Sequence, residues 1–142
     1  MRTPILFPLV PMLCAVLVSA IAHAGDLTLE VSVPTQRQGV VLAAVFNKAE
    51  GFPGSKPLHT ASAQLVQGKA ILLFANLPKG DYAATAFLDE NSNMKLDTNL
   101  FGIPTELYGF SRNARNLAGP PPFANAVFRI EDGAEQQIFD LK

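Results

Sequence analysis

Residues 26–33 have the sequence DLTLEVSV, in which polar and apolar side chains alternate without exception. This two-residue period is that of a β-strand with one face buried and the other in water. After a break at 34–38, residues 40–46 have the sequence VVLAAVF, which is apolar throughout, as in a central strand covered on both faces. The two stretches together predict a fold built from β-sheets around an apolar core.

Five more strands are predicted downstream, with turn-forming residues between most of them. They span residues 60–66, 69–74, 81–88, 123–130 and 135–141. Gln67-Gly68 joins the first two, and Asp132-Gly133 joins the last two, as tight hairpins. Seven short strands without a helical period are typical of an all-β fold, here a single antiparallel β-sandwich of the immunoglobulin-like or prealbumin-like kind. One long irregular loop, residues 89–122, interrupts the pattern, and a loop of this length is commonly functional.

Alternation within these strands selects the side chains that we expect to fill the core. They are Leu29, Val31, Leu42, Ala44, Phe46, Leu72, Phe74, Tyr82, Ala84, Ala86, Phe128 and Ile130. The single cysteine, Cys14, lies near the amino terminus, so packing rather than a disulfide bond must stabilise the sandwich.

The first 24 residues are predicted to be a cleavable signal peptide. Arg2 supplies a positive charge, residues 5–21 are uncharged, and Ala22-His23-Ala24 is a small-residue cleavage motif. Residues 25–142 then form a single β-sandwich domain, and we expect it to be periplasmic or secreted in a bacterium.

Two alternatives to cleavage are weaker. A spanning helix needs about 20 apolar residues, and Pro8 and Pro11 interrupt this shorter run. A lipid anchor on Cys14 favours a small residue just before it, where this chain has Leu13. We therefore expect no stable membrane insertion after cleavage. The net charge of −1, without a basic stripe, argues against nucleic acid or anionic lipid as a partner.

A short motif resembles a turn of known sandwich domains. Residues 74–82, FANLPKGDY, are similar to the strand-turn-strand of prealbumin-like and carboxypeptidase-regulatory-like domains. In this motif Pro78 fixes the entry to the turn, Gly80 permits a positive φ, and Tyr82 packs inward while its hydroxyl reaches the backbone. The motif supports the fold and implies no activity.

A longer set of motifs resembles the bacterial exported family known as domain of unknown function 2141. The similar blocks are NKAEGFP at 47–53, LPKGDYA at 77–83, DENSNMKLDTN at 89–99, FGIPTE at 101–106, YGFS at 108–111 and GPP at 119–121. The resemblance spans nearly all of the chain after residue 24 and implies a periplasmic domain, without an established activity. Members of that family usually carry glycine where this chain has Met94.

The first part of the long loop has the spacing of a calcium-binding loop. Positions 1, 3, 5, 7 and 9 of an EF-hand-like pattern are Asp89, Asn91, Asn93, the carbonyl of Lys95, and Asp97. However, position 6 is Met94 rather than glycine, and position 12 is Leu100 rather than a bidentate glutamate. The preferred alternative is a solvated loop whose Asn and Asp side chains cap their own turns.

Three aromatic residues follow in the same loop, Phe101, Tyr108 and Phe110. Aromatic rings on an ordered loop often bind sugars or peptides, so they are candidates for ligand binding. Alternatively, the three rings fold back and pack on the sandwich as a satellite core.

Catalytic groups are sparse, because His59 is the only histidine after residue 24 and no motif typical of a nucleophile is present. We therefore expect a non-catalytic, exported binding or structural module of the bacterial envelope, without a cofactor, whose partner is an envelope protein or polymer. One alternative is a ligand-binding module stabilised by Ca²⁺. The other is a small periplasmic hydrolase that uses acids of the long loop, such as Asp89, Glu90, Asp97 and Glu106.

Overall fold

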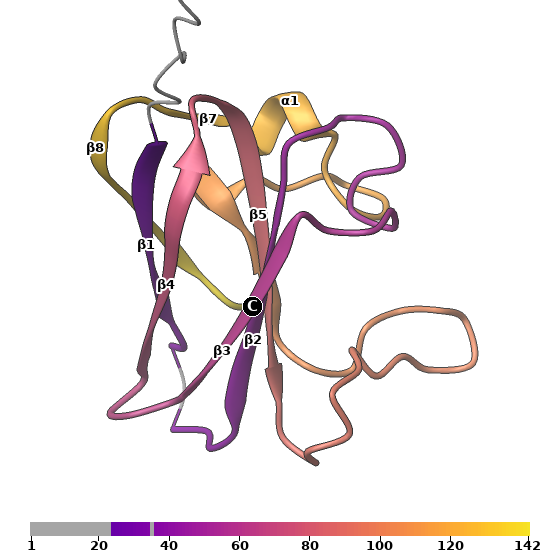
Figure 1. Cartoon of the computed structure of the whole chain (residues 1–142). Helices are drawn as coiled ribbons and strands as arrows, with labels where there is room; N and C mark the ends of the chain where they lie inside the picture. Colours follow the sequence, from indigo (N-terminus) through magenta and orange to yellow (C-terminus); the bar gives the residue numbers. More distant parts are fainter. Residues whose placement is uncertain (1–23, 35) are drawn as a thin grey trace, which may run out of the picture.

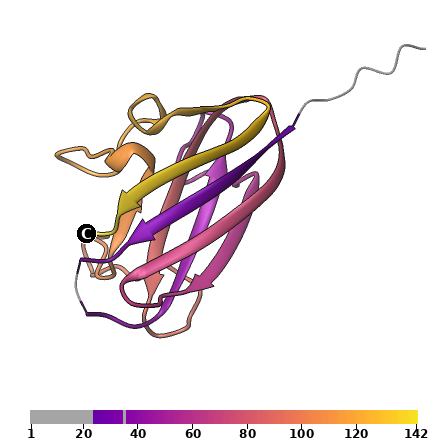
Figure 2. The same cartoon turned by 90° about the vertical axis from the view of Figure 1, so that its left-hand side faces the viewer.

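The alternating stretch near the amino terminus forms strand β1, Ala24–Ser32, with Leu27, Leu29 and Val31 on its buried face. The computed structural model describes residues 24–34 and 36–142, so the predicted signal peptide lies outside the described residues except for Ala24. Strand β1 is the middle strand of a three-stranded sheet. Its neighbours are β4, Lys69–Pro78, which runs antiparallel to it, and β8, Gly133–Asp140, which runs parallel. Figure 2 shows these three strands side by side.

The apolar stretch 40–46 forms β2, Val40–Phe46, in a second, five-stranded sheet. The other strands of this sheet are β3, His59–Gln64; β5, Gly80–Asp89; β6, Tyr108–Phe110; and β7, Phe128–Ile130. Strand β5 pairs with β2 along one edge and with β6 and β7 along the other, antiparallel in each case. The two sheets face each other (Figure 1), which confirms the predicted all-β sandwich.

The predicted hairpin at Gln67-Gly68 is only a turn. Val66 and Lys69 exchange two backbone hydrogen bonds, of 2.8 and 3.0 Å, and both turn residues have positive φ. Apart from this one β-bridge, β3 pairs with β2, whereas β4 pairs with β1. The chain therefore crosses from one sheet to the other at this turn.

The predicted strand 123–130 is correct only at its end, Phe128–Ile130, and its predicted hairpin with 135–141 is wrong. Residues Phe123–Ala126 form a short helix, α1, before β7 begins. Strand β7 then pairs with β5, while β8 joins the opposite sheet and lies parallel to β1. The physical reason is that β8 covers the open edge of β1 and thereby buries Phe139. Alternation within residues 123–141 does not indicate which edge a strand will join.

The core between the sheets contains most of the side chains that alternation selected, but not those of β2. Val41, Ala43 and Val45 point inward, whereas Leu42 and Ala44 are only half-buried on the outer face. Because all seven residues of β2 are apolar, the sequence does not indicate which face is the inner one. Phe46 is buried on the outer side, where its ring centroid lies 5.2 Å from that of Phe52.

A second, smaller apolar cluster covers one end of this outer face. Its members are Ala83, Phe110, Ala114 and Ala126, with Phe52, Tyr108 and Phe123 packed against them. The buried Ser111 hydroxyl joins the parts, since it accepts a hydrogen bond from the Ala84 amide at 3.0 Å and donates to the Ala126 carbonyl. The long loop is therefore regular in part, because it contains β6 and the 3₁₀ turn Ser111–Asn113. In the described part of the chain, no helix is long and apolar enough to span a bilayer.

The turn between β4 and β5 has the features that the FANLPKGDY motif predicts. Gly80 has a φ of 155°, and Tyr82 is 2% exposed. The Tyr82 hydroxyl donates a 2.8 Å hydrogen bond to the Pro78 carbonyl, which closes the turn. Burial raises the pKa of this hydroxyl above its ordinary value, because a phenolate is poorly solvated there.

Replacing Tyr82 with phenylalanine should lower the free energy of unfolding by about 0.5–1.5 kcal/mol near neutral pH, the usual contribution of one hydrogen bond. Since the pKa is raised in the folded state, the wild-type protein should also lose stability as the pH rises above about 10, the pKa of an unfolded tyrosine. Tyr82→Phe should remove that part of the alkaline loss. Urea unfolding from pH 7 to 11 measures both effects, and identical alkaline slopes for the two proteins would contradict this prediction.

Candidate functional site

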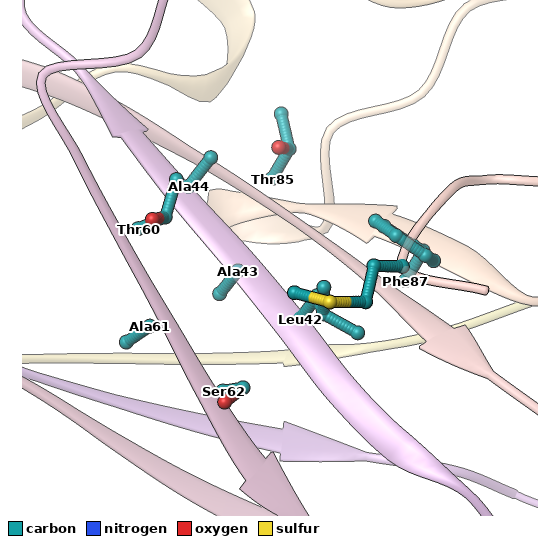
Figure 3. A pocket seen from close by; sticks show the side chains of 9 residues that line it. Leu42, Ala43, Ala44, Thr60, Ala61, Ser62, Thr85 and Phe87 are labelled. Carbon is teal, nitrogen blue, oxygen red and sulfur yellow. The ribbon is translucent and has the colours of Figure 1, made fainter. Parts of the chain in front are cut away.

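A hollow on the outer face of the five-stranded sheet is the main candidate site. The strand register places two rows of side chains across β3, β2 and β5. One row consists of Ser62, Leu42 and Phe87, and the other consists of Thr60, Ala44 and Thr85. Figure 3 shows these six side chains along the three strands. Together with Met94 they line a pocket of about 430 Å³, which we call the outer trough.

The outer trough continues into a second hollow of about 220 Å³, because Thr85 and Phe87 line both. Leu96 and Tyr108 are among the other residues that line the second hollow. The residues lining both hollows carry no charge, and their polar side-chain groups are hydroxyls. Such a surface suits an apolar or weakly polar group rather than an ion.

Two buried carboxylates fix residues 89–97, which we call the polar loop, beside the trough. Asp89, 2% exposed, accepts hydrogen bonds from the amides of Asn93 at 3.2 Å and Met94 at 2.9 Å. Glu106, 7% exposed, accepts hydrogen bonds from the amides of Glu90 at 3.0 Å and Asp97 at 3.1 Å. A charged acceptor strengthens each bond, so these contacts order the loop and place Met94 at the edge of the trough.

The predicted metal ligands lie close together but bond to one another. The Nδ2 groups of Asn91 and Asn93 donate to the Asp97 carboxylate at 2.5 and 2.8 Å. The Oδ1 atoms of the same two residues accept hydrogen bonds from the amides of Asn93 and Lys95. This is the self-capping arrangement of the preferred alternative. Within residues 24–34 and 36–142, no three His, Cys, Asp or Glu side chains gather as a metal-binding group.

The three predicted aromatic residues are not brought together. Tyr108 and Phe110 lie on β6 with ring centroids 5.9 Å apart, and Phe110 also packs against Phe52 in the second cluster. Their position is that of the satellite core considered as the alternative. Phe101 lies elsewhere, on the exposed segment that follows the polar loop, and its side chain is 86% exposed.

The acids of the hydrolase alternative already have structural partners. Asp89 and Glu106 accept backbone amides, and Glu90 forms a 2.7 Å ion pair with Arg37. His59 is exposed at the start of β3. The residues that line the outer trough include neither His59 nor any of the four acids, Asp89, Glu90, Asp97 and Glu106.

Sequence reasoning missed Leu42, Thr85, Phe87 and Met94 as candidate site residues. Leu42 was predicted to lie in the core. Thr85 and Phe87 alternate with the core residues of β5 and therefore point outward. The signal in the sequence was the apolar run 40–46. Only one face of this strand can pack in the core, and no predicted strand covers the other apolar face. An apolar outward face in the middle of a sheet indicates either a covering element or a binding surface.

The fold and this surface define a small all-β sandwich with an uncharged trough on one outer face. The chain belongs to the family described as "Uncharacterized protein conserved in bacteria (DUF2141)", whose sequence model matches residues 29–138. This match confirms the resemblance found in the sequence. No curated protein and no solved structure matches the chain.

Proposed function

We propose that this protein is an exported module of the bacterial envelope that acts by binding rather than by catalysis. The outer trough takes an apolar or weakly polar group of an envelope protein or polymer. The observation that carries the proposal is the uncharged lining of this hollow, formed by Leu42, Phe87 and Met94 with neighbouring hydroxyls. Filling the hollow removes apolar surface from water, which favours binding.

A comparison of corresponding strands supports the trough as the binding surface. On β1, the outward residues Thr28, Glu30 and Ser32 are polar, as expected for a face in water. On β2, the outward residues Leu42 and Ala44 are apolar. They are not members of the second apolar cluster, so that cluster does not explain why they are apolar. The outer face at β2 therefore combines an apolar central strand with a hollow that Met94 of the polar loop also lines.

A calcium-stabilised module is a second candidate, because the backbone of the polar loop has the turn that such a loop needs. Asp89 binds the Met94 amide, and Met94 has a φ of 61°, in the left-handed region that position 6 of an EF-hand-like loop requires. Rotation of the Asn91 and Asn93 amides would present oxygens in place of the groups that now donate to Asp97. Calcium binding would then replace four internal hydrogen bonds, the two to Asp97 and the two that the Asn91 and Asn93 oxygens accept from the backbone.

Export can be checked by the mass of the protein recovered from the periplasm or medium. The Ala22-His23-Ala24 motif predicts that this form begins at Gly25. Intact-mass spectrometry of the exported protein gives the answer directly. A form that retains residues 1–24, or that carries lipid on Cys14, would contradict the proposal.

Binding in the outer trough can be measured with the uncharged fluorescent probe Nile red. Phe87→Asp places a charge in the lining and should weaken probe binding about tenfold or more, as expected for the loss of one large apolar contact. Met94→Asn should also weaken binding, and it should not harm the fold because asparagine tolerates positive φ well.

The matched control is Ile71→Asp, which introduces the same charge on the exposed face of the opposite sheet. It should leave probe binding unchanged. Thermal unfolding of each variant establishes that it is folded. Equal loss of binding in the control, or no loss in either trough variant, would show that the probe does not report on this site.

Calcium binding is expected to be weak, with a dissociation constant of about 10⁻⁴–10⁻³ M, since only Asp89 and Asp97 supply carboxylates. Asp97→Asn should abolish the heat of titration without unfolding the protein. Asp89→Ala should lower the melting temperature with or without calcium, because its carboxylate holds two backbone amides. Micromolar binding would mean a stronger site than proposed, and no heat at millimolar calcium would leave the loop as purely structural.

A further inference from the structure

Residues 98–105 form a narrow projection, which we call the apolar finger. It extends away from the sandwich at the right of Figure 1. Thr98 and Pro104 form a β-bridge, and the amide of Thr105 donates to the Asp97 carbonyl at 2.8 Å. The base of the finger is held by the buried Glu106, which binds the Asp97 amide. The finger is thus an ordered element with a fixed attachment.

The tip of the finger consists of large apolar side chains in water. Leu100 is 100% exposed, Phe101 is 86% exposed and Ile103 is 59% exposed. Residues 98–105, TNLFGIPT, include no charged side chain. Three adjacent exposed apolar side chains on an ordered projection indicate a surface that meets an apolar phase.

The backbone of the finger makes several hydrogen bonds within the finger itself. The Asn99 side-chain oxygen accepts hydrogen bonds from the amides of Phe101 at 2.9 Å and Ile103 at 3.1 Å. The Gly102 amide donates to the Asn99 carbonyl at 3.0 Å, and the Asn99 amide donates to the Ile103 carbonyl at 2.9 Å. Pro104 has no amide hydrogen. Since unpaired backbone groups are what make entry into an apolar phase unfavourable, this pairing lowers the penalty.

We propose that the apolar finger inserts its tip into the surface of a lipid bilayer, as a reversible peripheral contact and not as a stable insertion of the chain. A stable protein interface needs roughly 800 Å² from each partner, far more than a convex tip of a few residues offers. Insertion into lipid needs only that the exposed side chains leave water. The finger contains no basic residue, so apolar partition rather than attraction to anionic headgroups drives insertion. The proposal does not depend on the outer trough.

Residues 25–142, which contain both sheets, provide the protein for a vesicle test. The protein of residues 25–142 should sediment with phosphatidylcholine vesicles. It should sediment equally with vesicles that also contain phosphatidylglycerol, and salt should have little effect. A variant with both Leu100→Ser and Phe101→Ser should bind about a hundredfold more weakly, roughly tenfold for each side chain. Leu73→Ser, at an exposed apolar position on β4, is the matched control and should bind as the wild type does.

Fluorescence locates the contact, because the chain contains no tryptophan. The emission of a Phe101→Trp variant should shift to the blue with phosphatidylcholine vesicles and be quenched by brominated lipid, while Leu73→Trp should do neither. Binding that requires phosphatidylglycerol, or that survives the double serine change, would overturn the proposal. So would a blue shift that appears without lipid as protein concentration rises, since it would show that the finger docks on a second copy.

Discussion

The backbone pairing of strand β5 is the constraint on which the functional side of the molecule depends. This strand hydrogen-bonds to β2 along one edge and to β7 and β6 in succession along the other. Its start is closed by the Tyr82 hydroxyl on Pro78, and its end is Asp89, whose carboxylate organises the polar loop. The trough, the second cluster and the finger all take their positions from this one strand.

The sequence predicts where strands occur better than it predicts which strands pair. Alternation in residues 26–33 identifies β1 and its inner face, because each residue type is confined to one side. For β2 no such contrast exists, so Leu42 and Ala44 were assigned to the wrong face. The partner of β8 is β1, distant in the chain, and only the open edge of a formed sheet determines that choice.

The candidate site shows the same limit. The spacing of Asp89 to Asp97 predicted either a calcium-binding loop or, as the preferred alternative, a solvated loop that caps its own turns. The observed self-capping bonds follow from the local chemistry of Asn and Asp. The structural role of Glu106 was not predicted, because it requires contact with two amides that lie 16 and 9 residues away in the chain. The trough likewise arises where Phe87 meets Leu42 across paired strands, a contact set by register alone.

The parallel pair of β1 and β8 has a consequence for the order of events when the chain is made. Synthesis delivers the amino-terminal end first, yet the edge of β1 is completed by residues as late as Asp140. The three-stranded sheet cannot close until nearly the whole polypeptide has emerged. Completion of this sheet therefore waits for a contact between the first and the last strand of the fold, and contacts between residues so far apart in the chain form slowly.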